Sequence, residues 1–125
     1  TITPLVPEGY AQGTTSLIAF MMILSAQEYE RAADIRVSEN ADMRALFSEL
    51  VPNVRDAALK AKLEEAAKTQ DTSLKISALD AANYELRRLL IALHEHVEAQ
   101  EAANKRVWAL LKALAARRVL KLPMQ

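Results

Sequence analysis

The chain has 125 residues, of which 51% are hydrophobic and 26% are charged, values that fit one globular domain and exclude an intrinsically disordered chain. Its 16 basic and 16 acidic side chains cancel, so the chain as a whole has no net attraction for nucleic acid. Cysteine is absent, which excludes disulfides, thiolate metal sites and thiol catalysis.

The residue composition favours helices throughout. Good helix formers such as Ala, Leu, Glu and Lys are frequent, and only two glycines and four prolines occur. We therefore predict an all-α fold, an antiparallel up-and-down bundle of long helices that forms one domain over residues 1–125. Residues 1–13 contain two of the prolines and both glycines, and this composition predicts an extended N-terminal arm.

The first predicted helix follows this arm. Thr14 or Thr15 is a suitable N-cap, and no strong stop occurs before Pro52, because the residue before a proline is disfavoured in the α region. An uninterrupted helix over this range is roughly 55 Å long. A turn at residues 37–40 would divide it in two, and we keep this as the alternative.

Two further helices are predicted in the remainder of the chain. A short one covers residues 54–69, and Asp71 or Thr72 is a plausible N-cap for the next. From there to about residue 119 either one helix runs through or a turn lies at residues 99–104. The bundle therefore has three helices in the order long, short, long, or four if a long helix is split.

Two apolar stripes follow the long helices at alternating spacings of three and four residues, as in a helix–helix seam. Asn40 interrupts the first stripe and Asn83 the second. We expect both to be buried and hydrogen-bonded, and Asn83→Leu to preserve or raise the melting temperature while relaxing the choice of oligomer. The first stripe comprises Ile18, Met22, Ser25, Tyr29, Ala32, Arg36, Asn40, Met43, Phe47 and Leu50, and the second begins with Leu79, Asn83, Leu86, Leu90, Leu93 and Val97.

Residues 17–24 are apolar on every side of their helix, so a single intrachain seam cannot cover them. Neighbouring helices of the same core would bury them if the segment folded back. We favour the alternative that they form a subunit interface, which predicts a homodimer. The candidate interface residues are Leu17, Ile18, Phe20, Met21, Met22 and Leu24.

His94, His96 and Glu98 form the one cluster that resembles a metal or catalytic site. On a helix, His94 and Glu98 share a face, but His96 projects about 200° away from His94. Zinc sites on helices need ligands on a shared face, as in H-E-x-x-H, and that spacing is absent. We expect no metal, no cofactor and no catalytic residue here, with His94 hydrogen-bonded beside the core and His96 in solvent.

The segment 105–121 predicts a basic amphipathic helix. Its lysines and arginines could bind an anionic membrane surface or an acidic partner. Basic residues also stabilise the C-terminal end of a packed helix and cover the edges of its packed face, and we favour this interpretation. We expect neither nucleic acid nor membrane as a partner. The candidate basic surface comprises Lys105, Arg106, Lys112, Arg117, Arg118 and Lys121.

No nucleophile constellation or phosphate-binding glycine loop accompanies these features. The plan of long antiparallel helices in a small chain resembles that of flagellar and other export chaperones, a resemblance carried by no specific motif. We therefore expect a cytoplasmic, non-enzymatic interaction protein of the adaptor or chaperone type, which self-associates and binds a protein partner through an apolar helical face. The alternatives are a bundle that binds a small apolar ligand beside His94, and a peripheral binder of anionic surfaces.

Overall fold

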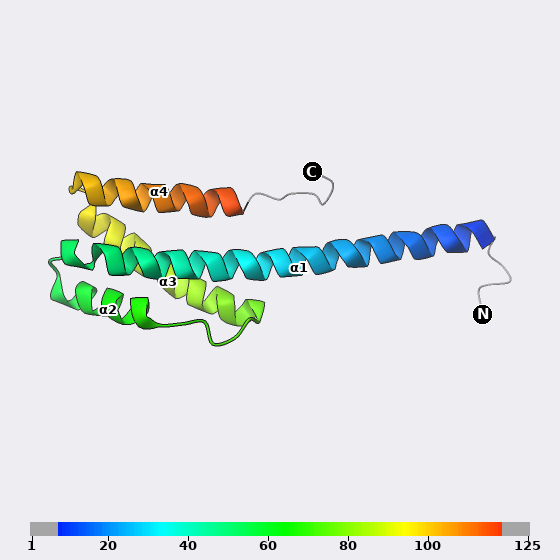
Figure 1. Cartoon of the computed structure of the whole chain (residues 1–125), viewed down its shortest axis with the longest axis horizontal. Coiled ribbons are helices and arrows are strands. Elements are labelled where there is room, and N and C mark those ends of the chain that lie inside the picture. The colour runs from blue at the N-terminus through cyan, green and yellow to red at the C-terminus, as the bar shows by residue number, and fades with distance from the viewer. Residues whose placement is uncertain (1–7, 119–125) are drawn as a thin grey trace.

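The computed structural model describes residues 8–118, and over this range the protein is helical, with no strand (Figure 1). The all-α prediction is confirmed. The elements are α1 (Glu8–Leu50), the short 3-10 helix η2 (Val51–Asn53), α2 (Ala57–Lys68), α3 (Ile76–Val97) and α4 (Glu101–Arg117).

Helix α1 is a single helix of 43 residues, which makes it about 65 Å long. It ends at Leu50 because Pro52 lies in the following 3-10 turn. The predicted turn at residues 37–40 is wrong, since these residues lie inside α1. The predicted extended arm is wrong for residues 8–13, which are helical because a glycine inside a helix costs only about 1 kcal/mol relative to alanine. Residues 1–7 of that arm lie outside the described residues.

The start of α2 is set by Asp56. Its carboxylate accepts hydrogen bonds from the backbone N–H groups of Ala58 at 2.9 Å and Leu59 at 3.2 Å, so the helix begins at Ala57, three residues later than predicted. Helix α3 begins at Ile76 without a side-chain cap. The predicted cap at Asp71 is wrong because that carboxylate binds other side chains, described below.

A turn at residues 98–100 separates α3 from α4, so the four-helix alternative is confirmed. The backbone N–H of Gln100 donates to the carbonyl of Val97 at 2.8 Å. The Gln100 side chain exchanges two hydrogen bonds with Asn53, at 2.9 Å to its side chain and 3.0 Å to its carbonyl. Gln100 thus ties the α3–α4 turn to η2, which follows the end of α1.

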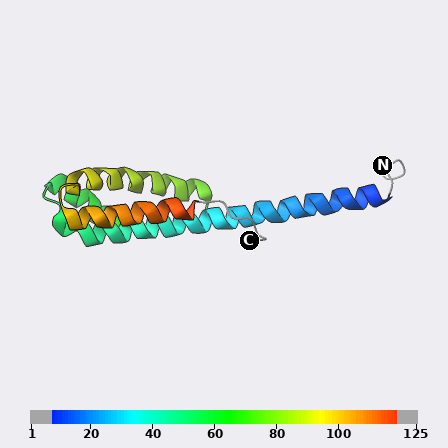
Figure 2. The same cartoon turned by 90° about the horizontal axis from the view of Figure 1, so that it is seen from above.

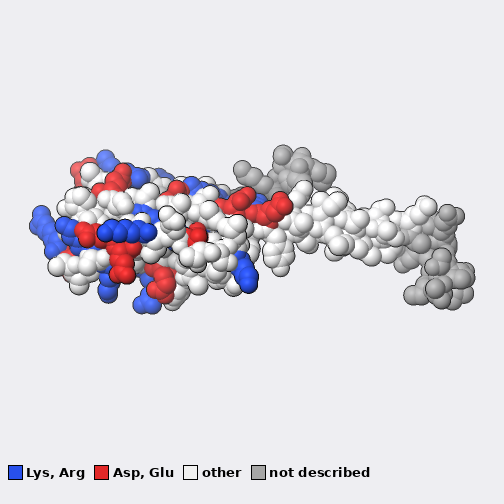
Figure 3. All heavy atoms as spheres, turned by 60° about the horizontal axis from the view of Figure 1, so that its bottom comes forward, with Lys and Arg blue, Asp and Glu red and all other residues white. Residues whose placement is uncertain are grey.

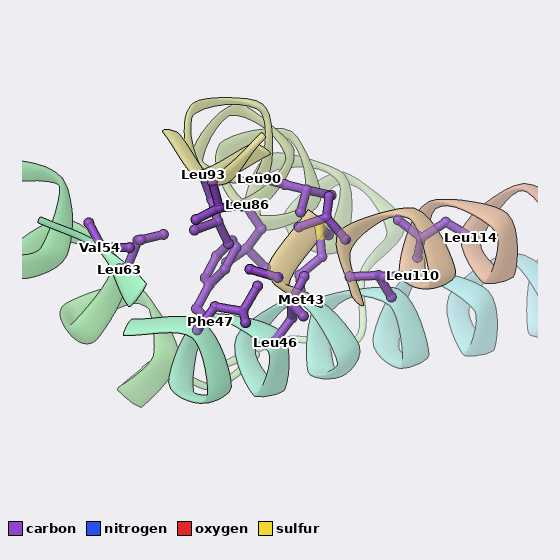
Figure 4. Close-up of a cluster of buried hydrophobic side chains, with 14 residues drawn as sticks. Met43, Leu46, Phe47, Val54, Leu63, Leu86, Leu90, Leu93, Leu110 and Leu114 are labelled. Atoms are coloured by element: carbon purple, nitrogen blue, oxygen red, sulfur yellow. The ribbon is translucent and has the colours of Figure 1, made fainter. Parts of the chain in front are cut away.

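The four helices form a bundle around the C-terminal half of α1 only (Figures 1 and 2). Helices α2 and α4 run antiparallel to α1, and α3 runs parallel to it (Figure 1). Side chains from every helix meet in the core, where Phe47 and Leu93 are fully buried (Figure 4). The N-terminal half of α1 projects beyond the bundle (Figure 2).

A search of the described residues for a helix that meets the length and hydropathy needed to span a bilayer finds none.

Candidate functional site

The projecting part of α1, residues 8–30, is called the α1 arm here (Figure 2). Within residues 12–30 only Leu24 is partly buried, and all other side chains are exposed. No charged residue occurs between Glu8 and Glu28, so the described part of this stretch is white in Figure 3, while the bundle carries both charges. Between 49% and 67% of the surface of each of these large apolar side chains is exposed: Leu17, Ile18, Phe20, Met21, Met22 and Ile23.

The apolar side chains of the arm surround the helix, and two opposite sides of it can be distinguished. At about 100° per residue, Thr15, Ile18, Met22 and Ser25 lie on one side, which we call the seam face. This side continues the stripe that carries Asn40, Met43 and Phe47 into the core. The other side, the outer face, carries Leu17, Phe20 and Leu24.

The seam face contains a shallow recess bordered by Ile18, Met21, Met22 and Ser25. These positions are spaced i, i+3, i+4 and i+7, which is the set of four residues that forms a hole for one side chain of an adjacent helix in a coiled coil. The recess therefore lies where a helix packed on the seam face would insert a side chain.

A buried polar cluster lies in the bundle just beyond the base of the arm. It consists of Glu39 and Asn40 on α1, Asn83 and Arg87 on α3, and Arg118 at the end of α4. The side chain of Glu39 is 0% exposed. It accepts two hydrogen bonds from Arg118, at 2.6 and 3.0 Å, and one from Arg87 at 3.1 Å. Glu39 thus joins the middle of α3 and the end of α4 to α1.

The two asparagines complete the cluster. Asn83 donates to the side-chain oxygen of Asn40 at 2.9 Å and to Glu39 at 3.1 Å, and accepts from Nε of Arg87 at 2.7 Å. Asn40 donates to the carbonyl of Leu79 at 3.3 Å and to Asp71 at 3.2 Å. Asn40 and Asn83 are both buried, and each amide has partners on both its nitrogen and its oxygen.

The charges of the cluster stabilise each other. Burial alone would raise the pKa of Glu39, but the hydrogen bonds and charges of Arg118 and Arg87 outweigh it and lower that pKa below its ordinary value of 4.5. The hydrogen bond to Glu39 raises the pKa of Arg118. Both groups are therefore ionised at neutral pH.

His94 and His96 have separate structural contacts. Nε2 of His94 lies 3.0 Å from the side-chain oxygen of Asn104, and the ring meets Trp108 edge to face at 5.3 Å. His96 accepts a 3.0 Å hydrogen bond from the backbone N–H of Arg55 and is partly buried, so its expected place in solvent is wrong. In the part of the chain that the structure describes, no three His, Asp or Glu side chains converge as metal ligands.

Acidic residues neutralise much of the expected basic surface. Arg106 binds Glu49 at 2.7 Å, Arg117 binds Asp42, and Arg118 binds Glu39. Lys105 forms an exposed pair with Glu101 at 3.4 Å, and Lys112 is exposed. Lys121 lies outside the described residues. The arginines of this helix therefore bind α1 rather than presenting a free basic face.

An open groove of about 540 Å³ lies between α2 and α3, lined by apolar residues such as Leu59 and Leu89 and by charged residues such as Lys62 and Glu85. His94 does not line it. The groove therefore differs from the closed apolar pocket beside His94 that a ligand-binding bundle would need.

Sequence reasoning identified the arm residues and the asparagines but missed Glu39. In the sequence, the sign of its role is that it stands beside Asn40 on a side of α1 that otherwise faces the core. Glutamate is rarely buried, so its burial was not predicted.

In comparisons with models of known families, with curated proteins and with solved structures, nothing matches this chain.

Proposed function

We propose that this chain is a non-enzymatic helical interaction protein of the adaptor or chaperone type, which self-associates and binds protein helices through the α1 arm. The observation that supports the proposal is the arm itself. Six large apolar side chains stand exposed on a segment without charge, beyond a bundle that buries its own core. Contiguous apolar surface of this kind marks interaction sites in proteins.

The two sides of the arm suit the two parts of this proposal. The seam face carries the recess that a packed helix fills, and the outer face presents Leu17 and Phe20 in the opposite direction. Met21 and Met22 add flexible, polarisable side chains that adapt to different partner surfaces. One face can therefore serve self-association while the other remains open to a protein partner.

Sedimentation over a range of concentrations tests the proposal. We expect the wild type to associate, and the double variant Phe20→Glu with Met22→Glu to be monomeric, because each face then carries a charge that association would have to bury. The control is Ile91→Glu, which places the same charge on an exposed apolar position of the bundle and should leave association unchanged. A wild type that stays monomeric at high micromolar concentration would contradict the proposal.

A further inference from the structure

The seam face of α1 is covered inside the bundle and uncovered along the arm. Within the bundle, α3 packs on this side of α1, where Asn83 donates to Asn40 and Asp80 binds Arg36. Helix α4 packs on the outer-face side of α1, where Arg31 donates a 3.2 Å hydrogen bond to the carbonyl of Arg117. Among the described residues no segment of the chain covers the seam face between Thr15 and Ser25. The uncovered part of the seam face thus lies beyond the start of α3.

We infer that the arm of a second copy of this chain packs on this part of the seam face, running antiparallel to the first, so that the two seam faces cover each other. The inference rests on the proposed function. It specifies which segment binds the seam face, in which direction it runs and in which register. In this arrangement the arm of the second copy lies on the side of α1 that α3 covers inside the bundle.

The position of the bundle selects the antiparallel direction. In a parallel pair joined by the seam faces, both bundles would lie at the same end, each with α3 on the side that faces the other α1. The two α3 helices would then compete for the same space. In an antiparallel pair the bundles lie at opposite ends, so neither obstructs the arms.

The length of the arm sets the register. Its 23 residues span roughly 35 Å, and residues 10–30 of two such arms overlap when Ile18 of one lies opposite Met22 of the other. Each N-terminus then reaches the base of the other arm, close to Arg31. Thr15 lies opposite Ser25 of the second copy, and Met22 of the second copy is positioned at the recess on the seam face.

Charge agrees with this arrangement. In the antiparallel register, Glu28 lies opposite the uncharged Gln12 of the second copy, and the middle of the contact contains no charged residue. The seam faces therefore pair in this direction without opposing two charges.

Disulfide trapping tests direction and register, and the absence of native cysteine leaves no background. Thr15→Cys and Ser25→Cys are made as two separate proteins. In the proposed register, identical positions are about 15 Å apart along the helix axis, too far for a disulfide, whereas Thr15 and Ser25 of different copies are adjacent. Under mild oxidation we expect a covalent dimer from the mixture of the two variants and none from either variant alone.

Two results of the trapping experiment would overturn the inference. Covalent dimers from each variant alone would show a parallel pair. If the mixture of variants gives no covalent dimer although the wild type associates, another surface such as the α2–α3 groove receives the arm. Each of these results leaves the proposed function standing, whereas a monomeric wild type contradicts both the inference and the proposed function.

A pair of matched variants tests which face is used. Met22→Glu places a charge on the seam face, and Phe20→Glu places the same charge about 200° away on the outer face. We expect Met22→Glu to halve the sedimenting mass to that of the 13.9 kDa chain, and Phe20→Glu to leave a dimer. The reverse assignment, with unchanged helical circular dichroism in both variants, would overturn the inference.

Discussion

The side-chain amide of Asn83 on α3 donates a 2.9 Å hydrogen bond to the side-chain oxygen of Asn40 on α1, in the interior of the bundle. This bond fixes the axial position of α3 against α1, because a shift by one turn would separate the two amides. Glu39 accepts from the same Asn83 nitrogen atom at 3.1 Å and extends the link to α4 through Arg118. The cluster therefore sets the register of three helices at the point where the α1 arm leaves the bundle.

The first prediction concerns the asparagine pair. Asn83→Leu leaves the Asn40 oxygen without its donor and Nε of Arg87 without its acceptor, so we expect a loss of about 1–3 kcal/mol in the free energy of unfolding. This reverses the expectation from sequence that Asn83→Leu preserves or raises the melting temperature. Urea denaturation measures the change, with the exposed neighbour Tyr84→Leu as control. An unchanged or higher stability would contradict the prediction.

The second prediction concerns the charge of Glu39. Glu39→Gln keeps the size of the side chain but removes the anion that Arg87 and Arg118 bind, so we expect a loss of about 2 kcal/mol. Both arginines are partly exposed and are rehydrated in the variant, which keeps the loss moderate. The control is Glu85→Gln on the exposed side of α3. Equal stabilities of the two variants would show that the buried charge contributes nothing.

The third prediction is the pH dependence that follows from the lowered pKa of Glu39. In the unfolded chain this carboxyl binds a proton near its ordinary pKa of 4.5, and in the folded protein it does so at lower pH. Its contribution to stability is therefore complete above pH 4.5 and is lost as the pH falls through the folded pKa. We expect the melting temperature of the wild type to fall below pH 4.5 more steeply than that of Glu39→Gln. Parallel profiles would contradict this.

The fourth prediction concerns the basic helix α4. Arg106 and Arg117 each bind an acidic residue of α1, so we expect the wild type to elute from heparin at low salt. The double variant Asp42→Asn with Glu49→Gln frees both arginines and should elute at higher salt, with about one more counterion released per arginine. Strong retention of the wild type would instead support the anionic-surface alternative.

The sequence predicted the elements that depend on local periodicity. In α3, residues Leu79, Leu86 and Leu93 step along one face and all are buried. The turn at residues 98–100 remained one of two alternatives because it contains neither glycine nor proline, and the bonds of Gln100 to Asn53 that hold it join positions 47 residues apart. Contacts of this kind are not visible in a local pattern.

The candidate site was likewise predicted only in part. The exposed arm followed from residues 17–24, since a run that is apolar on every side exceeds what one seam covers. The cap predicted at Asp71 failed because Arg44 binds that carboxylate at 2.9 Å from α1. Glu39 was missed because its arginine partners lie 48 and 79 residues away in the chain. Long-range charge pairing therefore had to come from the structure.

The last prediction is that His94, His96 and Glu98 form neither a metal site nor a catalytic site. His96 lies about 200° from His94 around α3, and its Nε2 already accepts the backbone N–H of Arg55. His94 has a partner in Asn104 at 3.0 Å and packs edge to face on Trp108. Glu98 lies one turn from His94 and could act as a second metal ligand beside it. Two ligands are fewer than the three or four that hold a divalent metal tightly.

Metal analysis of protein purified without an affinity tag, together with His94→Ala, tests this prediction. We expect no stoichiometric metal and a loss of about 1 kcal/mol in stability, from the hydrogen bond to Asn104 and the contact with Trp108. Trp108→Leu removes the ring contact alone and should account for part of that loss. A two-fold axis through α3 would bring His94 and Glu98 of two copies together, but the antiparallel arm pairing holds the bundles at opposite ends. Zinc, iron or manganese at near-stoichiometric level that disappears in His94→Ala would contradict both the prediction and that arrangement.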